Sequence, residues 1–350
     1  MKYTPEQQKA IVTVDKDLAV TAGAGAGKTR VLVDRIIYIL KNGLADIDEI
    51  VAITYTNKAA LEIRERLRKE MLNQKEDSLF SIKLKKLGIA YIGTIHSFCL
   101  RLLMENPVEA GINSDAKILE EYRADAWLRD SIEESVLDNL EKKRVYQLTS
   151  ELGFNKLLRE LFGTMKTMQN QGINPTVIEK MAENDGEKTI AELICKAFNA
   201  YQLKKEEQGF LDYEDILQKT FSMLNSKPEV LKAYQKKFKY IMIDEYQDLN
   251  FAQDRILRLL GEGTNLFVVG DKKQSIYGFR GARVELFEKL KGHLESRGQA
   301  IVLKDNFRSD ERIIEFVNRS YENLMAAYEP ISANRRHKVH KNICFITPES

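Results

Sequence analysis

The stretch Leu18-Ala-Val-Thr-Ala-Gly-Ala-Gly-Ala-Gly-Lys-Thr29 determines the fold more than any other part of this chain. The apolar run 18–21 predicts a buried strand, and the residues from Arg30 to Leu40 have a helical pattern. A glycine-rich loop between a strand and a helix is the setting that a phosphate-binding loop requires. The residues that we expect to surround the phosphate are Ala22, Gly23, Ala24, Gly25, Ala26, Gly27, Lys28 and Thr29.

The glycines of this loop let backbone N–H groups close around phosphate oxygens, and the dipole of the following helix adds positive potential. Lys28 would reach the β- and γ-phosphates, and the Thr29 hydroxyl would bind Mg²⁺. Ala22 stands where the first glycine usually occurs, a change that a turn tolerates. The alternative is a flexible glycine turn without a ligand, which the adjoining strand, helix and Lys-Thr pair disfavour.

Strand and helix patterns alternate along the chain around this loop. Helical spacing is clear from 57 to 71, where Ala59, Ile63, Leu67 and Met71 recur every four residues. Such alternation predicts an α/β fold, a parallel sheet with helices on its two faces. The runs that predict buried strands are 18–21, 50–54, 89–92, 240–243, 266–269 and 300–303.

The alternation stops near Asn106-Pro107 and resumes after Leu211. Between these points the sequence is helical and charged, without a convincing strand. We therefore predict an α/β domain made of residues 1–105 and 211–299, into which an all-α subdomain of residues 106–210 is inserted. The expected core of the subdomain consists of Trp127, Leu128, Leu137, Leu140, Leu157, Leu158, Leu161 and Phe162.

Two adjacent acids, Asp244 and Glu245, follow the predicted strand 240–243. A carboxylate pair at the carboxyl end of a strand suits a P-loop ATPase, in which Asp244 holds Mg²⁺ through water and Glu245 accepts a proton from the attacking water. Taken alone, two such acids are usually a solvated turn or a helix cap. Together with the glycine loop they predict a hydrolytic site.

The segment 270–282, Gly-Asp-Lys-Lys-Gln-Ser-Ile-Tyr-Gly-Phe-Arg-Gly-Ala, leaves another predicted strand at its carboxyl end. It places an amide that can sense a phosphate, Gln274, close to the aromatic residues Tyr277 and Phe279, which Arg280 follows. A nucleotide contact and a stacking surface on one segment would let a bound phosphate move a bound base. The alternative is an ordinary loop with a half-buried Tyr and Phe.

Composition describes a globular protein, with 43% hydrophobic and 30% charged residues. The formal net charge is only +2, so a nucleic-acid site must be a local patch. Each candidate patch is more often a solvated face than a phosphate contact. The candidates are 83–86, 232–239 and 335–338.

Cys99, Cys195 and Cys344 are widely separated, which argues against a zinc site or a disulfide framework and fits a reducing cytosol. The amino terminus has no apolar signal region, and no run of about 18 apolar residues occurs. We expect a cytoplasmic protein without a membrane partner.

These motifs, taken in order, resemble those of UvrD/Rep/PcrA-type superfamily 1 DNA helicases. The resemblance implies a RecA-like P-loop NTPase domain, and it implies that residues 300–350 begin a second, incomplete RecA-like domain. The segments 94–99 and 278–281 are also similar to the AddA and RecB branch. The motifs that carry the resemblance are Gln7 in 3–7, the loop 22–29, 54–60, 93–97, 244–248, 270–282 and 306–309.

The resemblance implies ATP and Mg²⁺ as cofactors. Gln7 would read the adenine edge, while Arg30 and Phe307 would sandwich the ring. Gln274 and Arg308 would contact the γ-phosphate, where the arginine stabilises transition-state charge. The residues expected to act in hydrolysis are thus Glu245, Lys28, Gln274 and Arg308.

The resemblance also implies a DNA-binding surface. Tyr55, Tyr277 and Phe279 match positions on which single-stranded bases stack, each base being worth about 1–3 kcal/mol. Phe279 replaces a tryptophan that is common in the family, which reduces the stacking area. Arg280 resembles a residue that couples nucleotide to DNA. The residues expected at the DNA backbone are Thr94, His96 and Asn57. The alternative for Asn57 is that it caps its helix.

The resemblance implies an ATP-dependent 3′→5′ DNA helicase motor, acting on single-stranded DNA and single-/double-strand junctions in repair or recombination. We expect an amino-terminal portion of such a motor, which does not unwind duplex by itself. One alternative is the ATPase subunit of an AddA/RecB-like or phage-defence complex with a partner nuclease. Another is a non-enzymatic module that binds single strands in response to ATP, which would not need Glu245.

Overall fold

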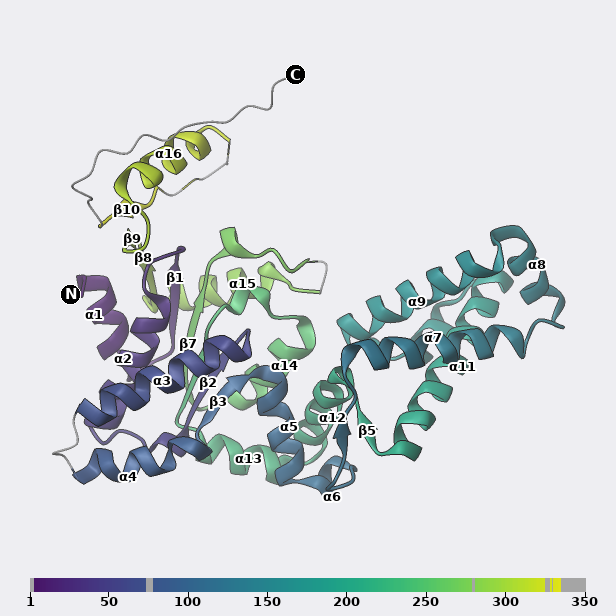
Figure 1. Cartoon of the computed structure of the whole chain (residues 1–350), viewed down its shortest axis with the longest axis horizontal. Coiled ribbons are helices and arrows are strands. Elements are labelled where there is room, and N and C mark those ends of the chain that lie inside the picture. Colours follow the sequence, from purple (N-terminus) through teal and green to yellow (C-terminus); the bar gives the residue numbers. More distant parts are fainter. Residues whose placement is uncertain (1–2, 74–77, 279–280, 325–327, 329, 335–350) are drawn as a thin grey trace.

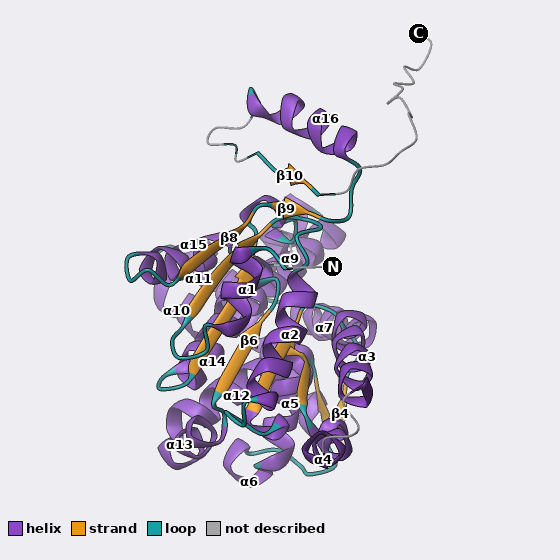
Figure 2. Cartoon of the chain, turned by 90° about the vertical axis from the view of Figure 1, so that its left-hand side faces the viewer, coloured by secondary structure: helices purple, strands orange, loops and turns teal. Residues whose placement is uncertain are grey.

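A parallel sheet forms the centre of the protein (Figure 2). The computed structural model describes residues 3–73, 78–278, 281–324, 328 and 330–334. Within this part of the chain the main sheet has six strands in the order β3-β2-β6-β7-β1-β8, and every neighbouring pair is parallel. The strands are β1 (Leu18–Ala22), β2 (Ile50–Thr54), β3 (Tyr91–Thr94), β6 (Tyr240–Ile243), β7 (Asn265–Gly270) and β8 (Ala300–Leu303).

Helices cover both faces of this sheet. Successive strand residues point to opposite faces, so Val20 and Met242 pack on one side while Ala19 and Ile243 pack on the other. The first face is covered by α1 (Pro5–Val12), α2 (Lys28–Lys41), α3 (Asn57–Asn73) and α4 (Ser78–Lys86). The second face is covered by α5 (Ile95–Glu105), α12 (Tyr213–Ser226), α13 (Pro228–Lys237), α14 (Phe251–Gly261) and α15 (Val284–Glu295).

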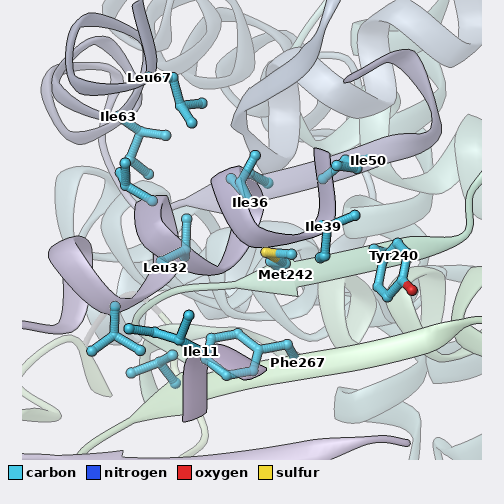
Figure 3. Close-up of a cluster of buried hydrophobic side chains, with 14 of the residues drawn as sticks. Ile11, Leu32, Ile36, Ile39, Ile50, Ile63, Leu67, Tyr240, Met242 and Phe267 are labelled. Atoms are coloured by element: carbon cyan, nitrogen blue, oxygen red, sulfur yellow. The ribbon is translucent and has the colours of Figure 1, made fainter. Parts of the chain in front are cut away.

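The core of the first face shows why these segments fold as predicted (Figure 3). Leu32, Ile36 and Ile39 lie on one side of α2, and each is fully buried against Met242 and Phe267 of the sheet. Burying one such side chain contributes about 1.5–3 kcal/mol. The helix therefore has little freedom to rotate, and the loop that precedes it is held at the carboxyl end of β1.

The helical insertion lies to one side of the sheet (Figure 1). It begins and ends at the short parallel strands β4 (Lys117–Ile118) and β5 (Phe210–Leu211), which pair with each other. The sequence predicted no strand between residues 106 and 209, and two residues carry too little pattern to reveal β4. Its helices are α7 (Glu121–Leu137), α8 (Lys143–Leu152), α9 (Phe154–Gln171), α10 (Thr176–Met181) and α11 (Asp185–Gln208), and α6 (Pro107–Ala110) precedes them.

Most of the predicted core of the insertion is correct. Leu128, Leu157 and Leu161 are buried, whereas Trp127, Leu158 and Phe162 pack partly buried against them. The prediction for Leu137 is wrong, because 47% of this residue is exposed. Leu128, Ile132 and Val136 recur at helical spacing and take the inward face of α7, so Leu137 points away. Leu140 is only half-buried.

A buried ion cluster fixes the junction between the insertion and the sheet domain. Lys205 of α11 is 1% exposed and donates hydrogen bonds to Asp212 at 2.7 Å and to Asp215 at 2.6 Å. The Tyr201 hydroxyl donates to Asp212 at 2.6 Å. Removing one partner from such a cluster leaves an uncompensated buried charge, which typically costs 3–5 kcal/mol. The insertion is thus anchored at α12.

The strand β8 (Ala300–Leu303) lies just beyond the predicted domain boundary at residue 299, yet it belongs to the first sheet. β8 pairs with β1, so it completes the first sheet instead of beginning a second domain. The chain then leaves the sheet domain, and α16 lies away from it (Figures 1 and 2). The remaining elements are β9 (Asp305–Asn306), α16 (Glu311–Glu322) and β10 (Ser332–Ala333), which pairs with β9.

No helix in the described part of the chain is both long enough and apolar enough to cross a membrane.

Candidate functional site

The glycine loop between β1 and α2 is open to an anion. Gly25 and Gly27 have φ of 77° and 81°, which lies in the left-handed region that glycine adopts without strain. Gly27 caps α2, and this cap makes no side-chain hydrogen bond to the first turn of the helix. The first backbone N–H groups of a helix require partners, and a phosphate can supply them.

The loop is held from its other side by the segment after β8. Asn306, which is 3% exposed, donates to the Ala24 carbonyl at 2.7 Å, and the Phe307 N–H donates to the Gly25 carbonyl at 2.9 Å. A Cβ on Gly25 would lie 2.8 Å from the Arg308 Cβ. Phe307 and Arg308 therefore lie at the loop, and their roles at adenine and γ-phosphate stay predictions. Asn306 was not predicted, because only its contacts reveal it.

Lys28 and Glu245 meet although 217 positions separate them. The Lys28 Nζ donates to both carboxylate oxygens of Glu245 at 2.7 Å. Glu245 has φ of 53°, the only described non-glycine residue in the left-handed region. This conformation aims its carboxylate at the glycine loop. An arriving phosphate and the Glu245 carboxylate would compete for the same ammonium group.

Two further carboxylates beside Glu245 are buried. Burial, with a contribution from the neighbouring Glu245, raises the pKa of Asp244 to about 6. The same causes raise the pKa of Asp248 to about 6. The Asp248 Oδ1 is buried and has no hydrogen-bond partner among the described residues. A cation beside these groups would favour their ionised forms. The described residues include no cluster of three or more His, Cys, Asp or Glu side chains that could hold a metal ion by themselves.

Gln274 lies next to this acidic cluster but contacts a residue that was not predicted. Its Nε2 donates to the Asp271 Oδ2 at 2.7 Å. The 3₁₀ helix η4 (Lys272–Gln274) follows β7 directly and brings Gln274 to the edge of the sheet where β1 and β6 also end. Gln247, buried within the 3₁₀ helix η3 (Tyr246–Asp248), connects the two segments.

Gln7 lies on the opposite side of the glycine loop. It forms a capping box with Thr4 at the start of α1, and its Nε2 donates to the Ala26 carbonyl at 3.0 Å. The Arg30 guanidinium lies over the Tyr3 ring at 4.4 Å from the ring centroid. Tyr3 is therefore a flat neighbour of Arg30 that was not predicted, since it precedes the periodic part of the helix.

The aromatic residues Tyr55 and Tyr277 stack on each other. Their ring centroids lie 4.6 Å apart with an angle of 26° between the planes. Tyr55 follows β2 and Tyr277 follows η4, so two residues predicted to bind bases are brought together from distant parts of the chain. Phe279 and Arg280, predicted to stack and to couple, lie outside the described residues.

Thr94 and Asn57 begin or precede helices beside these tyrosines. Thr94 caps α5, and its hydroxyl accepts a hydrogen bond from the Ser97 N–H at 3.3 Å. Asn57 is the first residue of α3 and not its cap, because the Thr56 hydroxyl accepts from the Ala59 N–H at 3.2 Å. The capping alternative for Asn57 is therefore wrong, and its side chain is exposed.

His96 is the second residue of α5. Its ring packs edge-on against Tyr213, with centroids 5.1 Å apart. Burial lowers the pKa of His96 to about 4, so the imidazole is neutral at pH 7. It can offer a phosphate a hydrogen bond but no charge.

A cleft of about 890 Å³ joins these residues to the helical insertion. Its walls come from the ends of β2, β3 and β6 on one side and from α7, α9 and α12 on the other. The predicted residues Tyr55, Asn57, Thr94 and His96 all line it, and so does Tyr213. The cleft therefore connects the predicted DNA contacts to Asp244 and Glu245.

Two of the candidate basic patches contain lysines that take part in the fold. Lys83 is 2% exposed and donates to the Leu40 carbonyl at 2.8 Å, so it supports the fold and is withdrawn from any ligand. Lys237 donates to the Tyr91 hydroxyl at 2.5 Å. The patch 335–338 lies outside the described residues.

Comparison with protein families matches residues 3–295 to the UvrD/REP helicase N-terminal domain. The match includes the glycine loop, both acids and the segment that carries Tyr277. The chain belongs to the UvrD/REP helicase family.

Individual relatives agree with the family match. The chain is 32% identical over 320 residues to the ATP-dependent DNA helicase PcrA of Staphylococcus aureus (strain Mu50), a match that covers 91% of this chain and 40% of the relative. It is 33% identical over 320 residues to PcrA of Bacillus subtilis (strain 168), covering 91% and 39% respectively. This member of the UvrD/REP helicase family thus spans about two fifths of the length of these relatives.

Proposed function

We propose that this chain forms the ATP-binding part of a DNA-dependent ATPase motor, an ATP-dependent DNA helicase or translocase. The observation that carries the proposal is the 2.7 Å contact between Lys28, the proposed phosphate-binding lysine, and Glu245, the proposed general base. The names of the PcrA relatives, ATP-dependent DNA helicases, support the same activity.

Mg²⁺-ATP is the proposed cofactor. The N–H groups of the loop 22–29 would bind the phosphates, and Lys28 would leave Glu245 for the β- and γ-oxygens. Thr29 and Asp244 would hold the metal, which supplies charge neutralisation at the phosphates. Gln274 and Arg308 would contact the γ-phosphate. Gln7, Arg30 and Phe307 form the proposed adenine site, to which the Tyr3 ring contributes a flat surface.

Glu245, once released from Lys28, would accept the proton of the attacking water. Its left-handed backbone conformation costs about 1–2 kcal/mol in a residue other than glycine. Such a cost is understandable if the position of the carboxylate is needed for a reaction. This observation favours hydrolysis over a module that merely binds single strands in response to ATP.

Single-stranded DNA is the proposed partner, and Tyr55, Tyr277 and Phe279 would stack against its bases. Thr94, His96 and Asn57 would contact the backbone, and Arg280 would couple the two ligands. The 3′→5′ polarity, the preference for single-/double-strand junctions, the role in cytoplasmic DNA repair or recombination and a partner nuclease of the AddA/RecB kind rest on the family resemblance alone.

ATP hydrolysis with and without single-stranded DNA tests the proposal. We expect the wild-type chain to hydrolyse ATP faster when DNA is present, and Glu245→Gln to lower kcat at least 100-fold while ATP still binds by calorimetry. Glu207→Gln, on an exposed face of α11, is the matched control and should retain full activity. Unaltered turnover in Glu245→Gln would contradict the assignment of the base.

A further inference from the structure

The Gln247 side chain links two segments of the site. It is 1% exposed, and its Nε2 donates to the Glu245 Oε2 at 2.8 Å and to the Asp248 Oδ2 at 3.2 Å. Its Oε1 accepts from the Asp271 N–H at 2.9 Å. A backbone N–H can only donate and a carboxylate can only accept, so these partners fix the orientation of the amide.

The connection continues from Asp271 to Gln274. The Asp271 Oδ2 accepts from the Gln274 Nε2 at 2.7 Å, and Asp271 is itself 6% exposed. The Ser275 hydroxyl donates back to the Gln247 carbonyl at 3.3 Å. Three successive hydrogen bonds therefore join Glu245 to Gln274 across the ends of β6 and β7.

The packing around Gly270 supports the same link independently. Gly270 ends β7 and its φ lies outside the left-handed region, so its backbone would accept any residue. A Cβ there, however, would lie 3.0 Å from the Gln247 Oε1 and 2.9 Å from a ring carbon of Phe287. The absence of a side chain at Gly270 is what allows the Gln247 amide to reach Asp271.

We propose that Gln247 is a positioning residue, which holds the Glu245 carboxylate in place and connects it to Gln274. This inference rests on the proposed ATPase activity. In the present structure Lys28 also holds Glu245. When a phosphate binds Lys28, the Gln247 Nε2 is the amide donor that stays with the carboxylate. Gln274, in contact with the γ-phosphate, would then be tied to the base through Asp271 and Gln247.

Two substitutions of Gln247 distinguish its hydrogen bond to Glu245 from its hydrogen bond with the Asp271 N–H. Gln247→Glu keeps an oxygen for the Asp271 N–H but removes the donor to Glu245. Gln247→Met has a similar size and removes both. We expect both variants to lower kcat for ATP about 10- to 100-fold, because a displaced catalytic group loses that much rate, while KM and calorimetric ATP affinity change less than about twofold.

Hydrogen exchange measured by mass spectrometry provides a readout that does not depend on turnover. The peptide around Asp271 should exchange faster in Gln247→Met, in which the Asp271 N–H has lost its acceptor, and at the wild-type rate in Gln247→Glu. The matched controls are Gln235→Glu and Gln235→Met. Gln235 donates to the Leu259 carbonyl at 2.8 Å on the far side of the sheet domain, and its variants should alter neither readout.

The outcomes distinguish the inference from the proposed function. If the wild type hydrolyses ATP and both Gln247 variants keep its kcat, the positioning role is wrong while the proposed function stands. A parallel loss of kcat, ATP affinity and thermal stability would show general damage to the fold, and it would also overturn the positioning role. If the wild type does not hydrolyse ATP with DNA present, the proposed function and this inference fail together.

Discussion

At the scale of single residues, the site depends on side chains whose surroundings alter their ordinary chemistry. Asp244 and Asp248 are buried beside Glu245, which raises the pKa of each to about 6. Such groups bind protons more readily than surface acids do, and a divalent cation would displace those protons. The pKa of His96 is lowered instead, since burial favours the neutral form of the imidazole.

The pKa of His96 predicts how stability depends on pH. The unfolded chain has an ordinary histidine with a pKa near 6.5, whereas the folded value is about 4. Above pH 6.5 both states are neutral, so His96 has no effect there. Between pH 6.5 and 4 the unfolded state binds a proton that the folded state does not, and the free energy of unfolding falls by up to about 3 kcal/mol.

Urea denaturation at a series of pH values checks this prediction. His96→Gln cannot take up the proton, so its stability should fall less steeply than that of the wild type between pH 6.5 and 4. His293→Gln, at an exposed position on α15, is the matched control and should follow the wild-type curve. Parallel curves for the wild type and His96→Gln would contradict the prediction.

At the scale of elements, the glycine loop is shaped by a segment almost 300 residues away. The hydrogen bonds of Asn306 and Phe307 to the carbonyls of Ala24 and Gly25 hold the loop that is proposed to bind phosphate. Asn306 also accepts from the Arg308 N–H at 2.9 Å. The Asn306 side chain thus contacts the loop and also holds Arg308 beside it.

Gly25→Ala tests this contact. The new Cβ would require a strained backbone and would lie 2.8 Å from the Asn306 amide and the Arg308 Cβ. Gly43→Ala is a matched control, since Gly43 has φ of 64° but nothing within 4 Å of a Cβ. We expect Gly43→Ala to cost about 1 kcal/mol from strain alone, and Gly25→Ala to cost about 1–3 kcal/mol more by urea denaturation.

ATP affinity should separate the two glycine variants further. Gly25→Ala displaces the loop, so calorimetry should show at least tenfold weaker ATP binding, whereas Gly43→Ala should bind as the wild type does. Equal affinity in the two variants would mean that the segment 306–309 does not shape the phosphate site.

At the scale of the whole molecule, the cleft between the sheet domain and the helical insertion is the surface proposed for DNA. Tyr55 and Tyr277, which follow β2 and η4, stack on each other. A DNA base would therefore have to stack on the outer face of one of these rings or separate the two rings. Phosphate contacts and base stacking make different physical contributions, which salt can separate.

Single-stranded DNA affinity should fall as KCl concentration rises, because phosphate contacts release counterions. Tyr277→Ala should weaken binding by about 1–3 kcal/mol at every salt concentration and leave the slope unchanged, since it removes stacking and no charge. Tyr321→Ala is the matched control, because it breaks the stacked pair that Tyr321 of α16 forms with Tyr328. Fluorescence anisotropy measures the DNA affinity of the wild type and of both variants. An affinity that does not depend on salt concentration would contradict binding through phosphates.

The sequence by itself determined most of the elements and the candidate residues of the site. The predicted strands 50–54, 240–243 and 300–303 agree with β2, β6 and β8, because buried strands of a parallel sheet are continuous apolar runs that local pattern reveals. The glycine loop, Asp244 and Glu245 could be predicted for a related reason. Their residue types and their position at strand ends are local properties.

Only the tertiary structure decided which distant groups meet. It paired Lys28 with Glu245, Tyr55 with Tyr277, and Gln247 with Asp271, and it placed β8 in the first sheet. It also buried Lys83, which the sequence presented as part of a basic patch. Such contacts depend on strand order and on how helices pack, and these follow from the burial of apolar surface over the whole chain and leave no local pattern.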